Sequence, residues 1–247
     1  MTAIKERPIL MSGEMVRAIL DGKKTQTRRV IKIPCYYSAW QIDNAVPHNS
    51  INNDGYCYLK ILHDEDSDNA GGRIHCPYGT IGDRLWVKET FQTFRKDTAE
   101  EANNKFIAGQ NLKSVNDLIE WGHMPSGHGE LGILYAADFG SWAYNTDSDL
   151  KPWKPSIFMP RKYSRILLEI TSIRVQRIQD ISDEEAMAEG CPSSRALDTD
   201  GKSFLYHPLK PIGWFKELWD KINAKRGHEW ANNDPVWVIE FKKVEAK

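Results

Sequence analysis

The sequence lacks several features that would place it in a recognisable class of protein. It contains no apolar run close to the roughly 20 residues that a membrane-spanning helix needs, and its first residues, MTAIKERPIL, lack the apolar core of a secretory signal. Cysteine is scarce, with 4 residues in 247 and no C-x-x-C pair. We therefore expect a cytoplasmic protein with free thiols that does not associate with membranes.

Metal-binding patterns are also missing. A zinc site could be drawn only from Cys35, Cys57, His75 and Cys76. Their spacing matches no standard ligand pattern, and adjacent residues such as His75 and Cys76 seldom reach one ion together. The sequence therefore predicts no metal and no cofactor.

An excess of charge of one sign is absent, because 33 lysines and arginines balance 34 aspartates and glutamates to a net charge of -1. Proteins that coat duplex nucleic acid must neutralise many phosphates, so this balance argues against such binding over the whole surface. A local patch is still possible. Positive charge is concentrated in segment 23–32 (KKTQTRRVIK), which has no acidic residue and contains Lys23, Lys24, Arg28, Arg29 and Lys32.

The residues around this basic segment predict a helix followed by a turn and a strand. Ser12 can cap a short helix with apolar residues at three- and four-residue spacing, and Gly22 can end it. The segment then leads into strand-like residues around Val30. Such a run is often only a solvated surface. A helix-to-strand junction can also aim side chains into a cleft, where Thr25 and Thr27 would add hydroxyl groups.

The rest of the chain predicts an α+β fold. Alternating apolar and polar residues indicate strands at 84–91 (RLWVKETF) and 165–177, and 236–241 (VWVIEF) reads as a buried strand. A capping box from Ser182 to Glu185 starts a helix that Gly190 ends, and Pro211 can open another. The length allows one large domain or two small ones.

The order of these motifs resembles the ASCH domain family, particularly its phage and prophage branch. The resemblance rests on G-x-K-x-x-T-x-R at 22–29, and on CPYGTIGDRLWVKE, WKPSIFMPRKYSRI, ISDEEAMAEG and the final strand. It covers most of the chain outside 35–73, 95–130 and 194–210. It implies a PUA-like mixed β-barrel with flanking helices, formed by a single domain over 1–247 with insertions at those three segments.

The resemblance also implies a site. In the bacterial N4-acetylcytidine amidohydrolases of the family, the motif supplies a lysine and a threonine, and a later helix supplies a glutamate. These correspond here to Lys24, Thr27 and Glu189, with Arg29 at the family's arginine position. Other ASCH proteins are linked to RNA cleavage through the same lysine. The phage branch often has histidine where this chain has Phe158, so we predict no acid or base there.

Three such groups can support hydrolysis of an amide or an exocyclic amine. A lysine can take the proton of a threonine hydroxyl if burial or cations such as Arg29 lower the amine's pKa from its usual value of about 10.4. Glu189 could then protonate the leaving amine. Arg29 would orient Glu189 or stabilise a developing oxyanion.

Two main functions follow from these observations. The first is a hydrolase, amidohydrolase-like or ribonuclease-like, that acts on RNA or a modified nucleoside or nucleotide through Lys24, Thr27 and Glu189. The second is a non-catalytic reader of RNA or modified nucleic acid, bound through Lys23, Arg28 and Arg29. In that case Thr27 is an ordinary strand residue and Glu189 a surface residue. The long insertions leave a third possibility, a phage assembly protein or a host-interaction protein with a protein partner.

Overall fold

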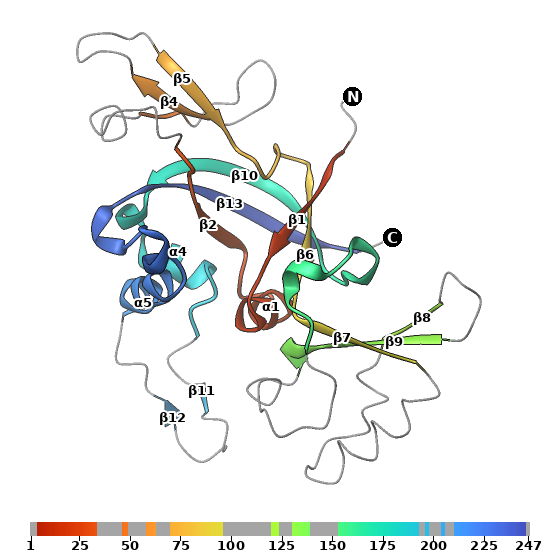
Figure 1. Ribbon diagram of the computed structural model, residues 1–247. Coiled ribbons are helices and arrows are strands. Elements are labelled where there is room, and N and C mark those ends of the chain that lie inside the picture. The colour runs from red at the N-terminus through yellow and green to blue at the C-terminus, as the bar shows by residue number, and fades with distance from the viewer. Residues whose placement is uncertain are drawn as a thin grey trace.

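A five-stranded mixed sheet forms the centre of the fold (Figure 1). Its strand order is β1 (Glu6–Leu10), β6 (Arg84–Lys88), β10 (Leu167–Arg177), β13 (Pro235–Val244) and β2 (Gln26–Val30). β1 and β6 are parallel, and the other neighbours are antiparallel. Together with the helices described below, this sheet makes the α+β fold that the sequence predicts.

The computed structural model describes most of the central sheet and its helices, and only parts of the long connections. The residues that it describes are 4–33, 46–48, 58–62, 70–95, 120–123, 130–138, 153–192, 196–197, 204–205 and 210–245.

Smaller sheets accompany the central one. They are β3 (Val46–His48), β4 (Tyr58–Leu62) and β5 (Ala70–His75); β7 (Phe91–Arg95), β9 (Glu130–Tyr135) and β8 (Glu120–His123); and the pair β11 (Ala196–Leu197) and β12 (Phe204–Leu205). β3, β4, β8, β11 and β12 lie within the segments predicted to be insertions. The strand predicted at 84–91 is divided between β6 and β7, because the chain leaves the ladder at Glu89.

The helices begin and end at the residues that the sequence marks. α1 (Gly13–Leu20) is capped by the Ser12 hydroxyl, and α4 (Asp183–Ala188) begins with the capping box. α5 (Pro211–Asn223) has its proline in the first turn. Short 3-10 helices lie at Ser156–Phe158, Arg161–Tyr163, Ile178–Asp180, Ala224–Arg226 and Trp230–Asn232. Among the described residues, none of the helices has the length and apolar character needed to cross a membrane.

Alternation along β13 divides the core into two layers. Trp237 and Ile239 pack in the cluster that contains Val16 of α1. Val236 and Val238 point to the opposite face, where they pack with aromatic residues of α5. Because successive strand residues face opposite sides, one strand supports both layers and fixes α1 and α5 on opposite faces of the sheet. β2 lies beside β13 and shares this alternation.

The central sheet is open within the described residues, so the closed barrel expected from the resemblance is not present there. β1 and β2 form its two edges, and they do not pair with each other. The chain that joins them forms α1, which buries Val16 and Ile19 in the core. A side chain bridges the two edges: Arg29 Nη2 of β2 donates to the Leu10 carbonyl at the end of β1, at 2.7 Å.

Candidate functional site

The turn after α1 packs against the end of α4, which brings two distant parts of the sequence together. The Lys23 and Lys24 amides both donate to the Ala18 carbonyl at 2.9 Å, and the Thr25 amide donates to the Ala188 carbonyl at 2.9 Å. Gly190 has a φ of +97°, and a Cβ there would lie 3.0 Å from the Ala18 Cβ. Glycine therefore permits both the turn after α4 and its close contact with α1.

A buried ion pair joins these two segments. Lys24 Nζ donates to Glu189 Oε2 and to the Glu189 carbonyl oxygen, both at 2.7 Å. The Lys24 side chain is 0% exposed and that of Glu189 is 3% exposed. Glu189 is the residue that caps α4 at its C-terminus. The helix end and the carboxylate thus present two acceptors to one amine.

Arg28 holds the second oxygen of the same carboxylate. Its Nη1 lies 3.3 Å from Glu189 Oε1, and its Nη2 donates to Glu185 Oε2 at 2.8 Å and to Gln176 Oε1 at 3.1 Å. The sequence predicted this orienting role for Arg29. Strand alternation explains the difference, because Arg28 faces α4 and α5 whereas Arg29 faces the α1 side and binds Leu10.

A cavity of about 300 Å³ lies along the free edge of β2, next to Glu189. Thr27 and Arg29 contribute to it from one face of β2, and Arg28 contributes from the other. α5 closes the opposite side with apolar residues that include Phe215 and Trp219. Thr27 is 2% exposed, and within the described part of the chain its hydroxyl has no hydrogen-bond partner. Lys24 does not line the cavity; it contacts the Glu189 carboxylate that does.

The edge of β2 adds backbone groups to this cavity. The Thr25 carbonyl accepts from the Phe241 amide, and the Ile31 amide donates to the Pro235 carbonyl, so odd-numbered residues of this segment bond to β13. In an antiparallel pair the residues between them point their peptide groups the other way. The peptide groups of Arg28 and Val30 therefore point to the free edge. We find no hydrogen-bond partner for them among the described residues.

Burial controls the proton equilibria around the cavity. It lowers the pKa of the Lys24 ammonium; Glu189 opposes this effect, and the cations Arg29 and Arg28 add to it. Burial also raises the pKa of the Tyr78 phenol at the cavity wall, although Arg29 counteracts it. The 2.7 Å hydrogen bond between Lys24 Nζ and Glu189 Oε2 gives this proton a direct path between the two groups.

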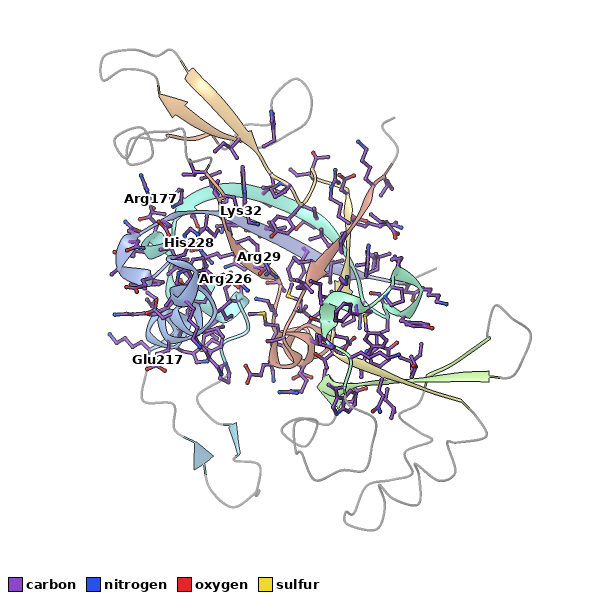
Figure 2. The ribbon with its side chains drawn as sticks, viewed as in Figure 1. Arg29, Lys32, Arg177, Glu217, Arg226 and His228 are labelled. Carbon is purple, nitrogen blue, oxygen red and sulfur yellow. The ribbon has the colours of Figure 1, made fainter. Side chains whose placement is uncertain are left out.

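The structure brings five of the six predicted site residues together and leaves one outside. Lys24, Thr27, Arg28, Arg29 and Glu189 line the cavity or contact a residue that does. Lys23 has a 57% exposed side chain, pairs with Asp21 at 3.1 Å and lines a separate hollow of about 480 Å³ that also includes Glu217. Figure 2 labels Glu217 well apart from Arg29 and Arg226.

Sequence reasoning missed the residues that α5 and its C-terminal turn contribute. Phe215, Trp219, Arg226 and His228 line the cavity. The apolar face of the helix was readable, but nothing in the pattern distinguishes an aromatic residue in the core from one at a cavity wall. Of the cysteines considered for zinc, Cys35 and Cys57 lie outside the described residues. The described residues contain no group of three or more histidine, cysteine or acidic side chains suited to a metal.

No protein-family model matches the chain, and neither does any curated protein or solved structure.

Proposed function

We propose that the protein is a hydrolase that removes an acyl group from the exocyclic nitrogen of a modified nucleobase, as a nucleoside or within RNA. Lys24, Thr27 and Glu189 are the reacting groups. The observation that carries the proposal is the contact between Lys24 and Glu189, 165 residues apart in the sequence, beside a cavity that Thr27 also lines. The resemblance to the ASCH family selects the same three residues. We take the open, curved sheet as a variant of the PUA-like barrel.

The cavity suits a neutral, flat ligand. Its apolar wall includes Phe215 and Trp219, and its inner end carries the Glu189 carboxylate. Lys24 and Arg28 are paired with Glu189 and Glu185, so these charges offset one another and the inner end favours an uncharged group such as a base. The free peptide groups at Arg28 and Val30 offer a donor and an acceptor to the polar edge of such a ring.

The chemistry starts with transfer of a proton from the Lys24 ammonium to the Glu189 carboxylate, which leaves an amine beside a carboxylic acid. The Thr27 oxygen attacks the acyl carbon while the Lys24 amine takes the hydroxyl proton. The carbon–nitrogen bond breaks, and Glu189 protonates the leaving nitrogen. This leaves an acyl-threonine, an ammonium and a carboxylate. General acid–base steps of this kind contribute about a hundred- to ten-thousand-fold in rate.

Water then completes the cycle. It attacks the acyl-threonine as the Glu189 carboxylate takes one of its protons, and the Lys24 ammonium returns a proton to the Thr27 oxygen. The free acid leaves, and the amine and carboxylic acid are restored. The mechanism requires Lys24 Nζ, which is hydrogen-bonded to Glu189, to reach the Thr27 hydroxyl. Lys24 lies in the turn between α1 and β2, two residues before that strand begins, and Thr27 is the second residue of β2.

Hydrolysis of N4-acetylcytidine, free and within single-stranded RNA, tests this function. We expect turnover by the wild-type protein and its loss in Thr27→Val and in Lys24→Arg, because arginine keeps the charge but cannot act as a base. Lys23→Arg is the matched control, since Lys23 lies outside the cavity. Equal rates for Lys24→Arg, Thr27→Val and Lys23→Arg would rule out these roles.

A non-catalytic reader is the second candidate. The observation that favours it is the tight connection of Lys24, which makes two hydrogen bonds to Glu189 and has no exposed surface. In this case the pair holds α4 against β2, and the cavity only binds. Salt-sensitive binding of RNA should then weaken in Arg28→Ala and Arg29→Ala, with no turnover by the wild type. An affinity for RNA that neither substitution changes would count against the non-catalytic reader.

A further inference from the structure

The charges around the cavity are arranged unequally between its inner end and its mouth. At the inner end, Arg28 and Lys24 are bound to carboxylates. At the mouth, Lys32 and Arg226 are exposed, and within the described part of the chain neither has an ion-pair partner. Among the described residues that line the cavity, Glu189 is the only acidic one. The mouth therefore carries positive charge that none of the described residues neutralises through an ion pair.

Arg29 connects the two ends. Its Nη2 donates to the Leu10 carbonyl and contacts the Met11 sulfur, both uncharged partners. Its Nε is buried and has no hydrogen-bond partner among the described residues. Arg226 is close enough to lower the pKa of Arg29, in addition to the larger effect of burial. Within the described part of the chain neither guanidinium has an ion-pair partner, although the Glu189 carboxylate is close enough to oppose the lowering of the pKa of Arg29. Like charges placed close together are unfavourable, and an anion bound between them would offset this.

These cations come from separate elements. Arg29 belongs to β2, Lys32 follows it, and Arg226 lies in the 3-10 helix after α5. Figure 2 shows them on one side of the molecule together with His228, and all four line the same cavity. His228 Nδ1 is held by Asp234 Oδ2 at 2.8 Å, which orients the imidazole ring. Different segments therefore converge on one anionic position.

We propose that the mouth of the cavity is a phosphate subsite formed by Arg29, Lys32 and Arg226, and that the ligand is a nucleotide rather than an uncharged nucleoside. The phosphate belongs either to a free nucleotide or to a strand of RNA. Guanidinium and ammonium groups are the usual partners of phosphate oxygens. This inference rests on the proposed function only in taking the cavity as the ligand site. The base of the nucleotide would lie at the inner end of the cavity and its phosphate at the mouth.

Binding measurements on the Thr27→Val protein test the subsite without turnover. Isothermal titration calorimetry at low salt would compare N4-acetylcytidine, its 5′-monophosphate and a short single-stranded RNA that contains the same base. We expect a phosphate-bearing ligand to bind at least about tenfold more tightly than the nucleoside, as charge-assisted hydrogen bonds commonly provide. Tighter binding of the monophosphate would show that the phosphate of a free nucleotide is enough to occupy the subsite. Tighter binding of the RNA but not of the monophosphate would show that the subsite binds a phosphate of an RNA strand.

Lys32→Gln with Arg226→Gln should remove most of that gain and leave the nucleoside affinity unchanged. The control is Lys23→Gln with Lys221→Gln, which removes the same charge from residues that line the other hollow. Equal affinity for all three ligands, or equal losses in the two double variants, would overturn the phosphate subsite. If the phosphate-bearing ligands bind more tightly than the nucleoside but the wild type shows no turnover, the proposed hydrolase activity is refuted and the phosphate subsite is supported.

Discussion

Two acid–base clusters of similar composition, one buried and one partly buried, lie in different parts of the molecule, and they differ in their access to a cavity. In one, Lys24 and Arg28 hold Glu189 beside the cavity. In the other, Arg165 binds both oxygens of Glu89, at 3.0 and 3.1 Å, and both oxygens of Asp138, at 2.9 and 2.8 Å. Neither of the two cavities described above includes a residue of the Arg165 cluster.

All three nitrogens of the Arg165 guanidinium donate hydrogen bonds to carboxylates. Its guanidinium also stacks over the Tyr135 ring, with the central carbon 3.9 Å from the ring centroid. Burial alone would lower the pKa of Arg165, but hydrogen bonds to Asp138 and Glu89 raise it above its usual value. For Lys24 the balance is the opposite, since burial lowers its pKa. The surroundings of Arg165 thus favour its charged form, whereas burial disfavours that of Lys24. We therefore expect a structural role for Arg165 and, under the proposed function, a chemical role for Lys24.

The largest expected effect is a difference in hydrolytic rate between substitutions of Glu189 and Glu89. Glu189→Gln should reduce hydrolysis about a hundred- to ten-thousand-fold, because the amide cannot exchange a proton with the leaving nitrogen. Glu89→Gln makes the same change in the other cluster and should leave the rate per folded molecule nearly unchanged. Initial rates, corrected for folded fraction by circular dichroism, provide the comparison. Similar losses in the two variants would remove the distinction.

The effect on stability should have the opposite order, with the larger loss in the Arg165 cluster. Arg165→Leu leaves two carboxylates without their cation, and breaking a buried pair in this way costs about 3–5 kcal/mol. Lys24→Met leaves Glu189 with Arg28, so we expect a smaller loss of about 1–3 kcal/mol. Urea denaturation at neutral pH measures both free energies of unfolding. A larger loss for Lys24→Met would mean that the cavity cluster is chiefly structural.

The pH dependence of stability should reveal the lowered pKa of Lys24. The unfolded chain, with an ordinary lysine pKa near 10.5, holds this proton more tightly than the folded protein does. Stability therefore rises with pH between the lowered pKa and 10.5. The free energy of unfolding of the wild type should increase over this interval relative to that of Lys24→Met. Parallel curves for the two proteins would contradict a lowered pKa.

The smallest effect is expected at the exposed end of the basic segment. Lys23 and Asp21 have side chains that are 57% and 56% exposed, and surface pairs of this kind contribute little. Lys23→Ala should change the free energy of unfolding by no more than about 0.5 kcal/mol and leave hydrolysis unchanged. A large loss of activity would place Lys23 in the site after all.

The sequence predicted those parts of the molecule that depend on local patterns. Ser12, the capping box at Ser182 and Pro211 mark the helix starts, alternation marks β6 and β10, and an apolar run marks β13. The pairing of Lys24 with Glu189 came from resemblance, because no local rule joins residues so far apart. Which of Arg28 and Arg29 contacts Glu189 depends on which face of β2 each occupies, and that is settled only when the neighbouring helices are in place.

The cations of the proposed phosphate subsite show the same limit. Lys32 stood in the predicted basic segment, but Arg226 lies in a turn of ordinary composition after α5. Its proximity to Arg29 depends on how α5 packs against the sheet through Phe215 and Trp219. Charge in a sequence can be counted, whereas its concentration at one cavity is a property of the tertiary structure.

The central claim is that Thr27 attacks the ligand with help from the Lys24–Glu189 pair, and mass spectrometry of the protein during turnover tests it most directly. After rapid acid quench of a reaction with N4-acetylcytidine, we predict the mass of an acetyl group on the peptide that contains Thr27, and none in Lys24→Arg. Turnover that proceeds with no acetyl group on Thr27 would contradict the account.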